Sequence, residues 1–179
     1  VHNFEIAMKA LFASIALFTL GVVSPMIVSA ADTERQAIVA ERGKDVMPFS
    51  LKATTHIFTP TDSGGGQRVV AKNVNDARQV ALVRQHLKEI KNQFEKGDFS
   101  GPTYIHGEEM PGLATLKSAQ PVQIKISYRN VKGGADLTYK TSDTNLVAAL
   151  HAWFDAQLSD HGPDAMNGHA HHHPTGMSQ

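Results

Sequence analysis

Two stretches of the chain present the same order of local sequence signals, and this order constrains the fold more than any other feature. Each contains a β-rich run, two or three glycines, a second β-rich run and an amphipathic segment. Glycine supplies the positive φ that a tight turn needs, so each stretch predicts an antiparallel hairpin and a helix. The predicted strands are residues 52–58, 67–72, 122–129 and 135–140, with turns at Gly64–Gly66 and Gly133–Gly134.

The two amphipathic segments are the strongest signals for helices. Their apolar residues recur at spacings of three and four, as on one face of a helix. The stripes are Val80, Val83, Leu87, Ile90 and Phe94 in the first segment, and Leu146, Val147, Leu150, Trp153, Phe154 and Leu158 in the second. The first helix can be capped by Asn75 or Asp76 and can end at Gly97. The second can be capped by Ser142, Asp143 or Thr144 and can end at Gly162.

These signals together predict an α+β fold. An antiparallel sheet made of two β-hairpins, each followed by an amphipathic helix that covers one face, buries both apolar stripes. We expect this ββαββα pseudo-repeat, preceded by a short helix at about residues 33–42. The alternative is that the architecture is simple enough to look repetitive without a duplication.

The N-terminal residues predict export. Met8-Lys9 precedes an apolar run, residues 10–28, and the small residues that follow permit cleavage after Ala30. The run is short for a membrane anchor, and Pro25 interrupts it. We expect residues 1–30 to be a signal peptide, with a misassigned start at 1–7, and the mature protein to be periplasmic.

Composition limits the remaining classes. Seventeen Lys and Arg balance seventeen Asp and Glu, which disfavours a nucleic-acid partner. Cysteine is absent, so disulfides, thiolate metal sites and cysteine nucleophiles are excluded. The expected division is one α+β domain at residues 31–162, long enough for its own core, and a flexible tail at 163–179.

The tail is rich in metal-binding side chains. With the two residues before it, it reads HGPDAMNGHAHHHPTGMSQ, and it includes His169, His171, His172 and His173. Imidazole and thioether groups are the ligands that copper, zinc and nickel select, copper above all. The alternative is an expression tag, but the histidine run is interrupted and is followed by PTGMSQ, so a native metal-binding tail is favoured.

Histidines in the domain are candidates for a second metal site. His86 and His151 occupy equivalent positions at the flanks of the two helical stripes, and side-by-side helices would bring them together. Asp155 follows His151 by one turn and could orient it. The alternative is that both are ordinary histidines at the boundary between core and solvent.

The connection from Gly97 to Gly112 adds further candidate ligands. We expect a long loop, and long ordered loops are disproportionately functional. It carries His106, Glu108, Glu109 and Met110, while His56 in the first strand and His161 at the end of the last helix complete the set. None of the spacings matches HExxH or an EF-hand loop.

Three segments resemble a family of small exported bacterial proteins over about residues 49–162. The matching features are His56, His86-Leu87, the loop motif IHGxxMPGL at 105–113 and the helix motif HxWFDAQxxDH at 151–161. Some of these sequences carry the label aspartate carbamoyltransferase. This chain lacks a Ser-Thr-Arg-Thr phosphate-binding run and is too short for that two-domain fold. The resemblance therefore implies which histidines matter but implies no activity.

The favoured function is a periplasmic metal-binding protein, for copper with zinc as the alternative, acting in tolerance, storage or delivery. A metal-transport protein and a second copy in a homodimer are partners compatible with this role. One alternative is an exported hydrolase or transferase that uses His106, Glu108 and Glu109 as acid–base groups. A second is a haem or small-molecule binder, although CxxCH is absent.

Overall fold

A computed structural model describes residues 29–169 of the chain, so all but the last two residues of the predicted export signal, and His171, His172 and His173, lie outside it. The helices are α1 (Ala30–Val46), α2 (Ala77–Phe94), α3 (Ser100–His106), α4 (Leu113–Ser118) and α5 (Thr144–His161), with 3₁₀ turns η1 (Leu51–Ala53) and η2 (Gly162–Asp164). The strands are β1 (Thr54–Thr61), β2 (Gly64–Ala71), β3 (Lys125–Val131), β4 (Gly134–Lys140) and β5 (Ala165–Asn167). The predicted α+β class is confirmed.

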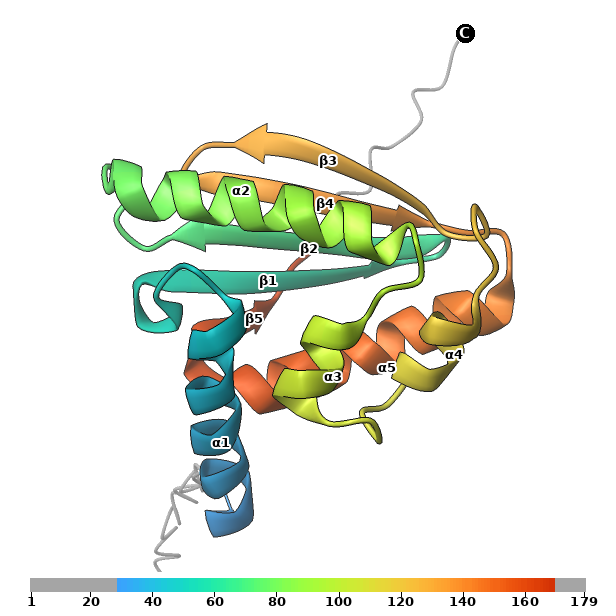
Figure 1. The fold of residues 1–179 in the computed structure, drawn as a ribbon, viewed down its shortest axis with the longest axis horizontal. Coiled ribbons are helices and arrows are strands. Elements are labelled where there is room, and N and C mark those ends of the chain that lie inside the picture. The colour runs from blue at the N-terminus through green and yellow to red at the C-terminus, as the bar shows by residue number, and fades with distance from the viewer. Residues whose placement is uncertain (1–28, 170–179) are drawn as a thin grey trace, which may run out of the picture.

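The sheet is mixed, with strand order β3-β4-β2-β1-β5 (Figure 1). The first three pairings are antiparallel, but β5 runs parallel to β1. The prediction of a purely antiparallel sheet was therefore wrong. The extra strand comes from residues 165–167, within the segment predicted as a flexible tail, and the Gly168 amide extends the pairing by donating to the Phe58 carbonyl at 2.8 Å.

Both long helices form as the apolar stripes predicted. The Asp76 side chain caps α2 by accepting from the Gln79 amide, and Asp143 caps α5 in the same way. Both helices contact the sheet, α2 over β2, β3 and β4 and α5 over β1, β2 and β5. They meet the same face of the sheet, because one pocket is lined by both helices and by inward residues of β1 and β2.

The triple glycine lies within β2 and does not form the turn. The turn is made by residues 62–63, and β2 already begins at Gly64. A Cβ on Gly65 would lie 2.3 Å from the Phe154 ring, and one on Gly64 would lie 2.2 Å from the Tyr139 carbonyl oxygen. These glycines are therefore required for the close approach of α5 and β4 to the strand, an effect that turn propensity does not reveal.

We expect Gly65→Ala to lower the free energy of unfolding by about 1–3 kcal/mol, because the added methyl group overpacks the contact with Phe154. Gly66→Ala is the matched control, since the nearest atom to its added Cβ is 3.8 Å away. Urea unfolding of both variants measures the difference. Equal effects of the two substitutions would contradict this account of the glycines.

The connection between the hairpin units contains two short helices, whereas the sequence predicted a long loop. The seven-residue α3 and six-residue α4 are too short to show helical periodicity. Phe99, at the start of α3, stacks on Phe94 with ring centroids 4.3 Å apart, which holds the segment against the core. No counterpart of α3 and α4 precedes β1 in the part of the chain that the structure describes, and the internal repeat stays a prediction.

The first helix is longer than predicted and covers the end of α5. Ser29 caps α1 by accepting from the Asp32 amide, and Val39 is buried in the core. Contacts of α1 with α3 and α5 bring its C-terminal end to the pocket described below. No helix among residues 29–169 has the length and apolar character needed to cross a membrane.

Candidate functional site

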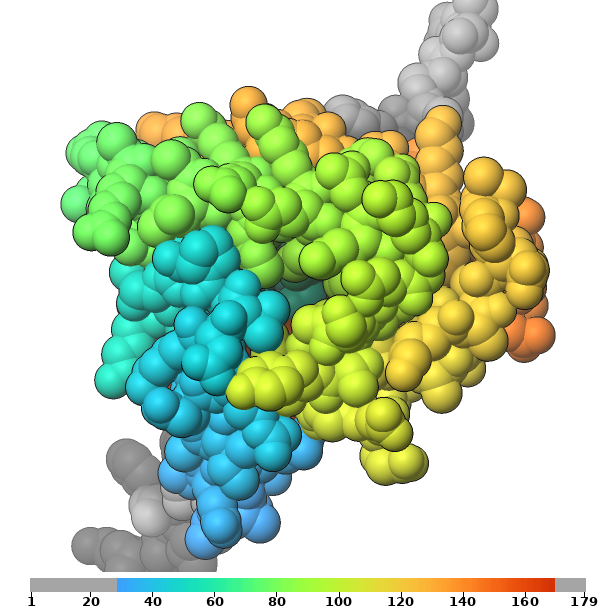
Figure 2. Space-filling view, viewed as in Figure 1, coloured from blue at the N-terminus to red at the C-terminus, as the bar shows by residue number. Residues whose placement is uncertain are grey.

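Four histidines line one pocket between the helices and the sheet. The pocket opens between the end of α1, α2 and α3, where Figure 2 shows a hollow in the surface. Its wall and floor come from β1, β2 and α5. The histidines are His56, His86, His106 and His161. The space available to the centres of water-sized molecules is about 50 Å³, enough for a few waters or a hydrated ion.

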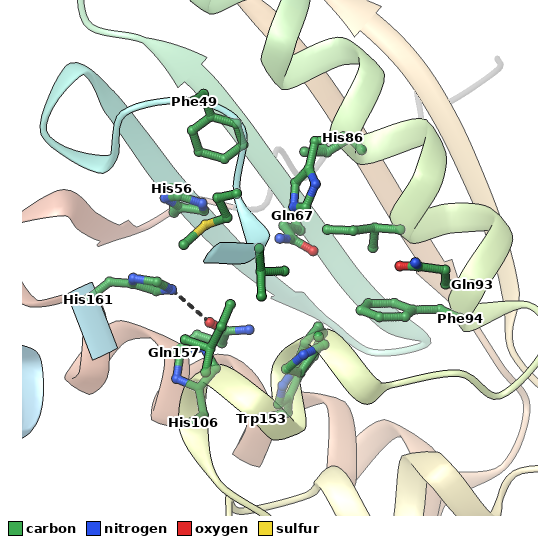
Figure 3. Close-up of a pocket in the computed structure, with 17 residues that line it drawn as sticks. Phe49, His56, Gln67, His86, Gln93, Phe94, His106, Trp153, Gln157 and His161 are labelled. Carbon is green, nitrogen blue, oxygen red and sulfur yellow. Dashed lines mark hydrogen bonds between the residues drawn. The ribbon is translucent and has the colours of Figure 1, made fainter. Parts of the chain in front are cut away.

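Three of these imidazoles form a contiguous cluster (Figure 3). The ring centroids of His56 and His161 are 4.9 Å apart, with planes within 3° of parallel, and His106 meets His161 edge-on at 5.2 Å. His86 makes no ring contact with these three imidazoles, but Phe49 contacts both His86 and His56, with ring centroids 5.5 Å and 5.8 Å away. Strands, helices and the predicted loop thus contribute to a single cluster.

His106 is held by a buried carboxylate. Its Nδ1 lies 2.7 Å from Oδ2 of Asp160, and Arg35 forms a two-point ion pair with the same carboxylate. Burial opposes ionisation of Asp160, but the hydrogen bonds from His106 and Arg35 keep its pKa below the usual value. An ionised carboxylate only accepts, so His106 Nδ1 donates to it, and in the neutral form of this imidazole Nε2 carries the lone pair.

His161 is oriented by a neutral partner. Its Nε2 lies 3.0 Å from the Gln157 amide oxygen, so Nε2 donates and Nδ1 carries the lone pair. Burial is the main cause that lowers the pKa of His161 to about 4, and His106 lowers it further. The carboxylates of Asp160 and Asp164 act in the opposite direction. His161 is therefore neutral near pH 7.

His56 carries a buried ring nitrogen without a partner. Among the described residues, no hydrogen bond reaches its Nδ1. Burial lowers the pKa of His56 well below 6.5, and the neighbouring histidines lower it further, while the Asp164 backbone acts weakly in the opposite direction. Burial also lowers the pKa of His86. Each ring of the cluster thus offers a nitrogen lone pair.

The cluster is not arranged as a formed metal site. In the part of the chain from 29 to 169, no group of three or more His, Asp or Glu side chains is placed to hold an ion. The lone pairs would have to be brought together by rotation of the rings. The geometry provides three imidazoles close together, and hydrogen bonds from Asp160 and Gln157 that orient two of them.

His151 lies away from this cluster. Its Nε2 contacts the carbonyl oxygens of Thr61 and Gly64, at 3.1 and 2.9 Å, beside the β1–β2 turn. Thr61 is five residues beyond His56 on β1, a distance of about 16 Å at 3.3 Å per residue. His86 lines the histidine pocket and His151 does not, so the structure does not gather the two around one site as the helical flanks suggested.

The other sequence candidates occupy different places. Met110 is buried in the core beside a second hollow that also adjoins Arg35 and the exposed Glu108 and Glu109. His169 lies by the opposite face of the sheet, next to residues of β1, β2 and β4. His171, His172 and His173 fall outside the described residues.

Sequence reasoning missed two features of the site. Met47 places a thioether-bearing side chain in the lining of the pocket, and Asp160 with Arg35 holds His106. Met47 lies between the predicted first helix and the predicted first strand, so it belongs to no periodic apolar pattern that would identify it. Asp160 directly precedes His161 in the SDHG sequence, which could have suggested a carboxylate at the site.

Comparison of the chain with family models, with curated proteins and with solved structures finds no match. The resemblance to small exported bacterial proteins consequently stays an expectation, and the functional argument depends on the pocket alone.

Proposed function

We propose that the protein binds a transition-metal ion in the pocket of His56, His106 and His161, copper being favoured and zinc the alternative. In this proposal it acts after export to the periplasm, in tolerance, storage or delivery of the ion. The observation that carries the proposal is the cluster of three buried imidazoles, each with one ring nitrogen that makes no hydrogen bond to the protein among residues 29–169.

The hydrogen-bonding partners of the imidazoles favour a metal over other ligands. A ligating histidine usually donates its second nitrogen to a carboxylate or carbonyl oxygen, which fixes the tautomer. His106 and His161 make such bonds to Asp160 and Gln157. Leaving a buried polar atom such as His56 Nδ1 unpaired costs about 1–3 kcal/mol, and a bound ion would remove this cost.

Loading requires rotation of the imidazoles toward a common point. Metal–nitrogen bonds are about 2 Å long, and rings with centroids about 5 Å apart can be reoriented to meet one ion. The cavity volume, about 50 Å³, suits an ion with a few waters and is far smaller than the pocket that a porphyrin requires.

The tail is proposed as a capture element that raises the local concentration of the ion. Its histidines, His169, His171, His172 and His173, would compete with the pocket in any binding measurement. They are best removed by substitution, because β5 shows that truncation after residue 163 would remove a strand of the sheet. A delivery role implies a metal-transport partner, and a homodimer is compatible with it. The two ββα units are proposed as an internal repeat.

The test measures copper and zinc affinity by chelator competition in protein whose four tail histidines are replaced by asparagine. We expect one ion per chain, and an affinity at least tenfold lower after His56→Ala or His161→Ala. Asp160→Asn should lower the affinity by about 10–100-fold, as loss of a ligand's hydrogen-bonding partner does.

His151→Ala is the matched control and should leave the affinity unchanged, since this histidine bonds to backbone carbonyls elsewhere. Effects of paired substitutions in the cluster should be nonadditive if the rings share one ion. Failure of the tail-substituted protein to bind either metal contradicts the proposal.

A second candidate is an exported hydrolase or transferase. It is favoured by the His106–Asp160 pair, because a carboxylate-oriented imidazole can act as a general base, and by Glu108 and Glu109 beside the adjoining hollow. Metal-free protein that cleaves a chromogenic ester, with activity lost on His106→Ala, would support this function instead.

A further inference from the structure

The lining of the histidine pocket contains no ionisable side chain other than histidine among the described residues. Its polar groups are imidazoles, the amides of Gln67, Gln93 and Gln157, and the indole N–H of Trp153, and the rest of the lining is apolar or aromatic. The carboxylate that contacts the cluster is Asp160, and its charge is already taken up by Arg35 and His106. The pocket therefore offers a cation neutral donors without a compensating negative charge.

Charge decides which cations such a pocket accepts. The Born cost of moving an ion from water into a low-dielectric interior grows with the square of its charge, so a divalent ion costs about four times as much as a monovalent ion of similar size. Sites for divalent ions usually include carboxylates or thiolates that offset this cost. Between residues 29 and 169, none of these groups lines the pocket.

Met47 supplies the pocket with a soft donor type. It directly follows α1, is 7% exposed, and lines the pocket together with the histidines. Gly43 makes room for it, because a Cβ at that position would lie 2.5 Å from the Met47 methyl group. Thioether sulfur is a ligand that selects monovalent copper. Phe49, two residues further on, contacts both His56 and His86 and helps to keep water out.

We propose that this pocket is specific for the cuprous ion, with Met47 as a ligand beside the histidine cluster. The inference rests on the proposed metal-binding function and narrows it: the neutral lining rejects divalent ions, and the thioether adds preference for monovalent copper. The approach path runs through the hollow between the end of α1, α2 and α3, where Val46, Gln93 and Pro102 also line the pocket (Figure 2).

The experiment compares Met47→Leu with Met110→Leu in protein whose four tail histidines are replaced by asparagine. Both methionines are buried, but only Met47 lines the histidine pocket. Exchange of methionine for leucine conserves volume, so folding should be retained and is checked by circular dichroism. Affinities are measured with cuprous ion under reducing, anaerobic conditions and, separately, with zinc ion.

We expect cuprous affinity at least 100-fold above that for zinc, and a loss of at least tenfold in cuprous affinity on Met47→Leu, with zinc affinity within about twofold of the parent. Met110→Leu should change neither. X-ray absorption at the copper edge should show a sulfur neighbour in the parent that is absent from Met47→Leu. Comparable affinities for the two ions, or a cuprous affinity insensitive to Met47→Leu, overturns the inference but leaves metal binding in place. Absence of binding of both ions refutes the proposed function as well.

Discussion

Lowering the pH from 6.5 to about 4 is expected to remove about 3 kcal/mol from the free energy of unfolding of the metal-free protein through His161 alone. Burial depresses the pKa of this imidazole from 6.5 to about 4, and each tenfold weakening of proton binding corresponds to about 1.4 kcal/mol. The folded state binds the proton more weakly than the unfolded state, so protonation favours unfolding and stability falls as the pH falls. His56, with its pKa also lowered, adds to the loss.

Carboxylates do not mask this effect. The pKa of Asp160 is lowered from 3.8, so its contribution to stability is present above that pH and is lost only under more acidic conditions. Urea titrations at half-unit intervals between pH 7 and 4.5 measure the slope. His161→Gln should flatten it. Unfolding free energies that stay constant across this range in the parent protein would show that the buried imidazoles are not neutral as described.

Removal of Arg35 is expected to destabilise the protein by about 2–3 kcal/mol at pH 7. The Asp160 side chain is 3% exposed, and Arg35→Met leaves its buried charge with His106 as the remaining partner. Breaking a fully buried ion pair costs about 3–5 kcal/mol, and the lower figure allows for the half-exposed position of Arg35.

Arg68→Met provides the matched control for Arg35→Met. Arg68 is similarly exposed and also bonds its carboxylate, Asp136, at two points, but Asp136 is 11% exposed and keeps the guanidinium of Arg129, whereas Asp160 keeps only the His106 imidazole. We expect a loss of about 1 kcal/mol or less for Arg68→Met. If the two substitutions cost the same, the His106–Asp160–Arg35 arrangement lacks the burial on which the site depends.

Elements with long apolar stripes could be predicted from the sequence. The spacing of Val80, Val83 and Leu87 identifies α2, and the stripe around Trp153 identifies α5, because these contacts fix the face that each helix must bury. The mixed sheet could not be predicted in this way. Its fifth strand has three residues and pairs with β1 through backbone groups, which leave no pattern in the sequence.

The candidate site could be predicted as a set of residues but not as an arrangement. His56, His106 and His161 are candidates because of their residue type and position, yet their proximity depends on how β1, α3 and α5 pack. The expected pairing of His86 with His151 assumes that equivalent flanks meet. The structure instead places His151 at the β1–β2 turn, where backbone carbonyls take up its Nε2.

A metal-loaded crystal structure tests the central claim most directly. Crystals of the protein with substituted tail histidines, soaked with cuprous ion under anaerobic conditions, would be measured at the copper absorption edge. We predict one anomalous peak in the pocket, at about 2 Å from nitrogen atoms of at least two of His56, His106 and His161. A fully soaked crystal with no peak in this pocket, or with copper bound only at the surface, would contradict the proposal that the buried histidine cluster is a metal site.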